Sequence, residues 1–430
     1  MSSSGTRRGW YHGWNIVAVC VLSQVAFSGI AVNTFSLFLH SWARDLHAQI
    51  STLQLGFSAY GLISACLAPI GGLLADKYPS RLLFGTGLLI TSCMCIAMSL
   101  ATSVWQFLAL YAFPVAVAAN TAGLLNANAV VSRWFVRRLG LALALTALGL
   151  SLPGIVLPPL VAAFLPSLGW RMVWRICGIA TALIVLPVVV GVLRDRPTVA
   201  DGLDYLAGGE ARGPHERQSG DRISIREIFA RRTFWLLVAL LLAMLGGYLG
   251  TVSNLAPLAI SRGLTPETAG VLLSMFNLFQ FVSTVLSGLV SDRIGNRLPL
   301  AGLAFASCAG TLLVAFGGSV APISLGVALV GFGMGFWPVL AAACAVEFGA
   351  EGAGRAFGLV TAFLPAVVLT PFAVAKTQEI TGSYIPALCV IAVLCLLAGA
   401  ACLLFMKERR AETAGTTQHG LGKNLVEPSP

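Results

Sequence analysis

Long apolar stretches recur along the whole chain at a spacing that predicts twelve helices crossing a membrane. The length of each stretch is close to the roughly 20 residues that an α-helix needs to span a bilayer core of about 30 Å. The first six helices are expected at residues 15–39, 52–75, 82–101, 105–131, 139–165 and 171–193. The second six are expected at residues 233–259, 267–290, 299–317, 320–347, 356–376 and 384–406. This pattern predicts an all-α integral membrane protein.

A polar interval separates the two sets of six helices. It contains many Arg, Asp, Glu and Gly residues, and none of its apolar runs is long enough to span a membrane. Near its end, the run ISIREIFARR predicts a short helix lying at the membrane surface. The expected organisation is an N-terminal six-helix bundle at 1–193, a cytoplasmic linker at 194–232, a C-terminal six-helix bundle at 233–406 and a cytoplasmic tail at 407–430.

Composition supports the membrane assignment and sets the orientation. Of the 430 residues, 57% are hydrophobic and only 10% are charged, whereas soluble proteins carry about 25% charged residues. With both termini placed in the cytoplasm, 22 of the 27 Lys and Arg residues lie on the cytoplasmic side. This positive-inside bias predicts a multi-pass protein of the inner (plasma) membrane with both termini cytoplasmic. The net charge of +10 is spread over short loops, so no nucleic-acid partner is expected.

The sequence offers little support for a metal site, a cofactor or catalysis. The ten cysteines lie almost entirely within apolar runs and form no CxxC pair, so neither a disulfide framework nor a metal site is expected. All five histidines fall in predicted loops or termini. An intramembrane enzyme would need a Ser–His pair, an acidic pair or a metal cluster at membrane depth, so we expect a protein that is not an enzyme.

One motif occurs twice, at the equivalent loop of each half. The second predicted helix ends in GLLADKYPSRLL from Gly72, and the eighth ends in GLVSDRIGNRLP from Gly288. Both read G-x-x-x-D-[KR]-x-x-x-R, in which the Gly permits close helix contact, the Asp accepts at a helix N-terminus and the basic residues face the cytoplasm. We interpret these loops, with two partners, as a conformational latch. Its candidate residues are Gly72, Asp76, Lys77, Arg81, Arg133, Gly288, Asp292, Arg293, Arg297 and Glu347.

The repeated loop resembles the hallmark loop of the major facilitator superfamily. The first copy departs from the family pattern at Pro79 and Leu82, whereas the second matches fully. The segments YHGWNIV, RWFVRRLGLALA, GWR and RRTFWLLV, in that order, are similar to the branch of monocarboxylate porters and oxalate–formate exchangers. The resemblance implies the major facilitator fold and a monomeric secondary transporter that works by alternating access in the lipid bilayer. It also implies a small-molecule solute, a monocarboxylate-like or aromatic organic acid, with a proton as a candidate coupling ion.

Polar residues deep within the predicted helices are the candidates for solute binding. Asn277, Gln280 and Thr284 are spaced i, i+3 and i+7, which places them on one face of the eighth helix. Such residues either line a central cavity or hold helices together by hydrogen bonds. In the fourth helix, Asn120, Thr121 and Asn128 share a side from which Asn126 is expected to turn away. The remaining candidates are Gln24, Tyr248, Asn254 and Trp337.

The eighth helix of this chain lacks the charged residues that the resemblance to carboxylate porters leads us to expect. Where related carboxylate porters carry an Arg and, in some members, an Asp in the eighth helix, this chain has Thr284 and Gln280. A buried carboxylate needs a cation or several donors, so an uncharged or amphipathic solute is the alternative. The run GLSLPGIVLPP in the fifth helix loosely resembles an antiporter motif, which leaves export open. A sensor that keeps the fold without transport also remains open.

Overall fold

The structure is a computed structural model that describes residues 11–135, 139–195 and 225–406, and these residues are nearly all helical. Eleven described helices are long and apolar enough to cross a membrane. One of them, Leu141–Val192, runs for 52 residues and is long enough for two crossings. The twelve predicted spans are therefore confirmed.

The helices form two groups that correspond to the two halves of the chain. The N-terminal half contains α1 (Gly13–Ser28), η1 (Gly29–Asn33), α2 (Phe35–Asp45), α3 (Ile50–Lys77), α4 (Ser80–Ser99), α5 (Val104–Ala122), α6 (Leu124–Trp134), α7 (Leu139–Ala180), η2 (Thr181–Val185) and α8 (Leu186–Val192). The C-terminal half contains α10 (Ile225–Ala230), α11 (Arg232–Ser253), α12 (Leu255–Ser261), α13 (Pro266–Ile294), α14 (Arg297–Phe316), α15 (Val320–Gly333), α16 (Phe336–Thr361), η4 (Leu364–Val367), α17 (Thr370–Thr381) and α18 (Ile385–Phe405). The short helix expected at the end of the linker is α10.

The long helices α7 and α16 each include parts of two membrane spans, and in each a glycine forms the turn between those spans. Gly169 within α7 has φ 70°, and Gly349 within α16 has φ 75°. Only glycine adopts this left-handed region without steric cost. Each turn falls where the sequence predicts the end of one span and the start of the next, so these boundaries are confirmed.

Five spans that the sequence predicts as continuous helices are broken in the structure, which corrects the ranges 15–39, 105–131, 233–259, 320–347 and 356–376. The breaks fall after the π-helical turn η1, at Gly123, at Asn254, between Gly333 and Phe336, and between Thr361 and Thr370. A break within a membrane span frees backbone carbonyl groups, which must find donors because the bilayer core holds no water.

Asparagine side chains supply these donors at three of the breaks. The Nδ2 group of Asn33 donates to the Ser28 carbonyl at 3.1 Å, and that of Asn254 donates to the Gly250 carbonyl at 2.9 Å. Asn126 donates to the carbonyls of Asn120 and Thr121 at 2.8 and 2.9 Å. These amides therefore stabilise helix breaks, a role that their position in an apolar run does not reveal.

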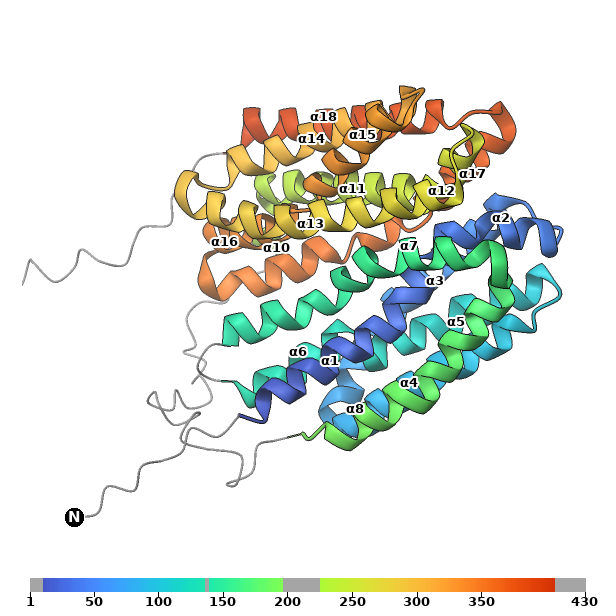
Figure 1. The fold of residues 1–430 in the computed structure, drawn as a ribbon. Helices are drawn as coiled ribbons and strands as arrows, with labels where there is room; N and C mark the ends of the chain where they lie inside the picture. The colour runs from blue at the N-terminus through green and yellow to red at the C-terminus, as the bar shows by residue number, and fades with distance from the viewer. Residues whose placement is uncertain (1–10, 136–138, 196–224, 407–430) are drawn as a thin grey trace, which may run out of the picture.

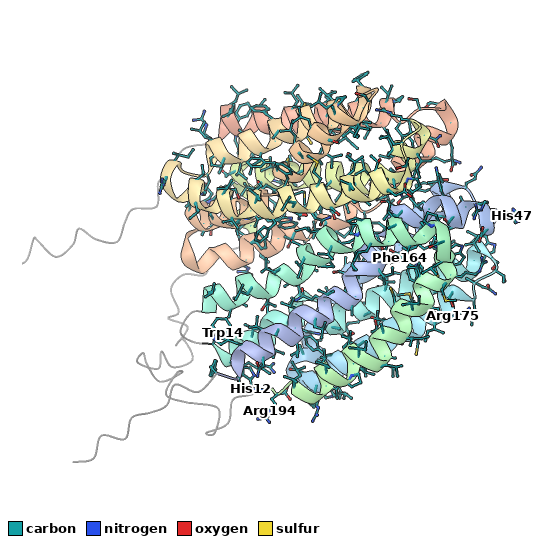
Figure 2. The ribbon with its side chains drawn as sticks, in the orientation of Figure 1. His12, Trp14, His47, Phe164, Arg175 and Arg194 are labelled. Atoms are coloured by element: carbon teal, nitrogen blue, oxygen red, sulfur yellow. The ribbon has the colours of Figure 1, made fainter. Side chains whose placement is uncertain are left out.

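The two ends of the molecule differ in how the halves meet. We call the end that carries His12 and Arg194 the linker end, and the opposite end, with His47 and Arg175, the far end (Figure 2). The ribbons of the two halves approach each other at the far end and diverge toward the linker end (Figure 1). The main contacts between the halves join α7 to α13 and α3 to α17.

Candidate functional site

Hydrogen bonds join the two halves at the far end. In α3, the buried Gln54 donates through Nε2 to the carbonyl of Ser253 at 2.7 Å and to Oδ1 of Asn254 at 3.1 Å. Asn254 in turn donates to the Pro371 carbonyl at 3.1 Å. Gln54 is 0% exposed and Asn254 is 1% exposed, so both amides are shielded from water and lipid. The N-terminal helix α3 is thus bonded to the end of α11, and Asn254 links that end to α17.

A second bond between the halves lies nearer the far surface. The backbone N–H of Ser51, in the first turn of α3, donates to Oε1 of Glu379 in α17 at 2.9 Å. Glu379 also pairs with Lys376 at 3.1 Å. A carboxylate at a helix N-terminus is stabilised by the unpaired N–H groups and the helix dipole. We call Ser51, Gln54, Ser253, Asn254, Pro371 and Glu379 the far-end joint.

A small cavity lies between the two halves, adjoining this joint. Its walls come from η1 and α2, from α3, from α11 and from α13. The lining residues are Val32, Asn33, Phe35, Ser36, Phe57, Tyr248, Leu249, Val252, Ser253, Leu273, Phe276 and Asn277. Its volume of about 20 Å³ is enough for roughly one water molecule. The lining combines aromatic rings, amides and hydroxyls, and none of these residues is charged.

Aromatic rings from both halves face this cavity. Tyr248 and Phe276 are stacked, with ring centroids 5.2 Å apart and planes 14° from parallel. On the other side, Phe35 and Phe57 pack with centroids 4.8 Å apart. The Oγ of Ser36 is buried in the wall and has no hydrogen-bond partner among the described residues. Rings of this kind can stack on a planar group, and the hydroxyl can bond to a polar substituent.

The structure brings only some of the predicted solute-binding residues to this cavity. Asn277 and Tyr248 line it, and Asn254 lies in the adjoining joint. Gln280 and Thr284 continue the face of Asn277 along α13 but are not among the lining residues. Thr284 is exposed, and its hydroxyl donates to the Gln280 carbonyl at 2.8 Å. The three residues therefore share one face of α13, and only Asn277, at one end of that face, lines the cavity.

Other predicted residues contact neighbours within their own half. Gln24 is buried and donates to the Thr146 carbonyl at 3.1 Å, so it joins α1 to α7. Asn120 donates to the carbonyl and hydroxyl of Ser64 in α3. Trp337 stacks on Phe336, with centroids 5.1 Å apart. Asn128 is half-buried in α6, and its Oδ1 has no partner among the described residues. In this conformation Gln24 and Asn120 hold helices together, whereas Phe336 and Trp337 are neighbours within α16.

Most residues of the site were not predicted from the sequence, among them Phe35, Ser36, Gln54, Phe57 and Phe276. Four of these five line the cavity, and Gln54 belongs to the far-end joint. An aromatic residue in an apolar helix has no distinctive sequence signal, because most such residues pack against neighbouring helices. Gln54 was detectable in principle as an amide close to the start of a predicted span.

The arginines of the repeated loops bond within their own halves. Arg81, at the start of α4, donates through Nε to the carbonyl of Val190 in α8. Arg297, at the start of α14, donates to the carbonyl of Leu403 in α18. The two loops thus repeat one contact, which ties the third helix of each half to the sixth.

Two partner residues of the predicted latch also have contacts. Arg133 donates to the Ala75 carbonyl at 3.1 Å, and Glu347 pairs with Arg231 at 3.6 Å. Lys77 and Arg293 are exposed. The side chains of Asp76 and Asp292 lie outside the described part of the structure.

The glycines of the motif do not have the contacts expected of them. A Cβ atom added to Gly72 or Gly288 would meet nothing within 4 Å. The expected close helix contact is therefore not made in this conformation, because both glycines lie toward the linker end, where the halves diverge. Close packing occurs instead between α7 and α13, where a Cβ on Gly154 would lie 2.2 Å from Oδ1 of Asn277.

Comparisons with known proteins agree with this architecture. The chain is 25% identical over 299 residues to the MFS-type transporter pytF of Aspergillus terreus, a match covering 68% of this chain and 94% of that protein. It is 25% identical to the oxalate:formate antiporter of Oxalobacter formigenes, over 66% of this chain and 64% of the relative. A bacterial homolog of the human lysosomal transporter Spinster, in an inward-facing and unoccupied conformation, has a similar fold. Its TM-score is 0.66 at 17% identity, over 92% of this chain and 94% of that one.

The family model of the Major Facilitator Superfamily matches residues 21–371 and again residues 255–428. Together these matches cover most of the sequence and include both halves of the fold. The chain therefore belongs to the Major Facilitator Superfamily.

Proposed function

We propose that this protein is a secondary transporter of a small organic solute, with the solute site at the cavity between the halves, which would widen from its present volume of about 20 Å³ to admit the solute. Access would alternate as the two six-helix bundles rock about this site. The far-end joint closes one side in the present structure. Since the linker end is expected to be cytoplasmic, this state corresponds to an inward-facing transporter in the inner (plasma) membrane.

The lining of the cavity favours a solute with an aromatic or other planar body. The observation that carries this proposal is the stacked pair of Tyr248 and Phe276 facing Phe35 and Phe57, with Ser36 and Asn277 as hydrogen-bonding groups. None of the lining residues is charged, and an ionised carboxylate buried there would lack a cation. An organic acid would therefore bind most readily in its protonated form.

A carboxylate solute is the second candidate. It is favoured by the relative described as an oxalate:formate antiporter and by the resemblance of the sequence to monocarboxylate porters. Such a solute would have to be held by amide and hydroxyl donors alone. Binding of a series of acids with matched neutral analogues separates the two candidates.

Proton coupling, on this proposal, uses the solute's own proton. No acidic residue lines the cavity. Asp45 at the far end accepts hydrogen bonds from the Trp170 indole at 2.9 Å and from Arg171 at 2.7 Å. The Trp170 bond is the main factor that lowers the pKa of the Asp45 carboxyl below its ordinary value, with Arg44 and Arg171 adding to it. Asp45 therefore stays ionised near neutral pH.

The test is ligand-induced thermal stabilisation of the purified protein, followed by flux in liposomes. Bound solute raises stability by mass action, by about 2.7 kcal/mol at 100 times its Kd. Aromatic neutral compounds and aromatic acids at low pH should stabilise the protein more than small aliphatic carboxylates. Tyr248→Ala should abolish this stabilisation, whereas Trp337→Ala removes a ring outside the cavity lining and should preserve it. Equal responses of the two variants would refute the assignment of the site.

Thr284→Arg tests the charge preference directly. The substitution introduces a guanidinium on the face of α13 that carries Asn277, where related porters present an Arg. Flux of small carboxylates should rise relative to flux of the native solute, since the guanidinium can bind a carboxylate in bidentate geometry. Unchanged selectivity at equal protein density would place this face of α13 outside the solute path.

A further inference from the structure

A large groove lies on the outer surface of the N-terminal half, between α4 and α8. Its volume is about 560 Å³, and its walls are almost wholly apolar. The lining residues are Pro79, Arg81, Leu82, Gly85, Thr86, Leu89, Leu186, Pro187 and Val190. Both walls belong to membrane-spanning segments, Ser80–Ser99 and Leu141–Val192, so the groove opens toward the acyl chains of the bilayer.

A fixed arginine lies at the linker end of this groove. The bond from Nε of Arg81 to the Val190 carbonyl holds the side chain across the two walls. The residue is exposed, and its two terminal nitrogens form no hydrogen bond with any described residue. The exposed Lys77 is the last residue of α3, just before the turn into α4. The nearby carboxylate of Asp195 already accepts a hydrogen bond from the backbone N–H of Ser80, at 2.6 Å.

The equivalent place in the C-terminal half is filled. Arg297 makes the corresponding bond to Leu403, but it is half-buried and its Nε is buried. Phe305 takes the place that Leu89 has in the N-terminal half, and its ring packs against Gly399 of α18, where a Cβ would lie 2.8 Å from the ring. In the N-terminal half, Leu89 lines the groove and is 50% exposed, so no ring fills the corresponding place.

We propose that this groove binds an anionic phospholipid, with one acyl chain between α4 and α8 and the phosphate held by Arg81. The apolar walls match an acyl chain in chemistry. The guanidinium lies at the end of the span, where lipid head groups are found, and its planar donors suit phosphate oxygens. Arg81 places a cation at this end of the groove, which favours an anionic head group over a zwitterionic one. The arginine of the first hallmark loop then has a ligand outside the transport path.

The experiment uses the full-length protein in mixed vesicles with a photoactivatable phosphatidylglycerol, and peptide mapping locates the crosslinks. Crosslinks should concentrate on α4 and α8, and unlabelled phosphatidylglycerol should compete better than phosphatidylcholine. Arg81→Gln should weaken the competition by phosphatidylglycerol about fivefold, the amount expected for one basic residue at the membrane surface. Arg297→Gln, its counterpart in the other half, should leave it unchanged.

A second pair of variants fills space without changing charge. Thr86→Phe places a ring in the groove and should remove the crosslinks even if Arg81→Gln does not fold. Gly302→Phe is the matched control at the equivalent place in α14, where a Cβ meets nothing within 4 Å. Crosslinks spread equally over α14 and α18, equal competition by the two lipids, or undiminished labelling of Thr86→Phe would each overturn the proposal.

Discussion

The far end and the linker end of this transporter are joined in opposite ways. At the far end, Gln54 and Ser51 of the N-terminal half bond to Asn254 and Glu379 of the C-terminal half. At the linker end, the arginines Arg81 and Arg297 bond within their own halves. The far end therefore holds the two bundles to each other, whereas the hallmark arginines hold each bundle together. This difference means that substitutions at the two ends should affect different properties, namely the balance of conformations and the stability of a half.

The largest expected effect is on the far-end joint. Gln54→Leu removes two hydrogen bonds between the halves, each worth about 1 kcal/mol. We expect the fraction of molecules whose far end is open to rise about 30-fold, because a shift of about 2 kcal/mol in the equilibrium corresponds to that factor. Distances between spin labels on Thr102 and Thr381, one in each half, should lengthen.

A second buried glutamine provides the control for this experiment. Gln24→Leu also removes an amide, but its bond to Thr146 lies within the N-terminal half. The label distance in Gln24→Leu should match that of the unsubstituted protein. If Gln54→Leu left the distance distribution unchanged, the joint would not be what closes the far end.

The next effect is on the stability of the C-terminal half. Arg297→Gln removes a charged hydrogen bond from a half-buried position, and we expect a loss of about 1.5 to 3 kcal/mol in the free energy of unfolding. Hydrogen exchange should rise in α14 and α18 while the spin-label distance at the far end stays constant. A change in that distance would show that Arg297 acts between the halves after all.

A smaller effect is expected from the equivalent change in the N-terminal half. Arg81→Gln removes the corresponding hydrogen bond. Because the Arg81 side chain is exposed, the free energy of unfolding should fall by less than about 1 kcal/mol. Exchange in α4 and α8 should rise less than exchange in α14 and α18 does in Arg297→Gln. Equal losses in the two variants would contradict the difference in burial between the halves.

The smallest effect is expected at Glu379. Glu379→Gln keeps an acceptor for the Ser51 N–H but removes the charge that favours the N-terminus of α3, which is worth about 0.3 to 1 kcal/mol. The spin-label distance should shift in the same direction as in Gln54→Leu, by less. Lys376→Gln tests whether the partner of Glu379 contributes, and it should shift the distance less than Glu379→Gln. A larger shift in Lys376→Gln would assign the effect to the ion pair.

The candidate site could be predicted only in part. Asn277 and Tyr248 were found because a polar group within an apolar span is visible in the sequence. Gln24 and Asn120 gave the same signal but proved to join helices, since a buried amide satisfies its hydrogen bonds with whichever backbone lies opposite. Phe35, Phe57 and Phe276 gave no signal, because their place at the cavity depends on how the two halves meet.

The sequence by itself determined the twelve spans, the division into two halves and the family. Apolar length and the positions of charge are fixed by the bilayer, so they can be recognised without contacts between helices. The tertiary structure decided where spans break, as at Asn254, which residues join the halves, as Gln54 does, and that Arg81 and Arg297 bond within a half. These properties depend on which helix packs against which and at what level, and no pattern within a single helix contains that information.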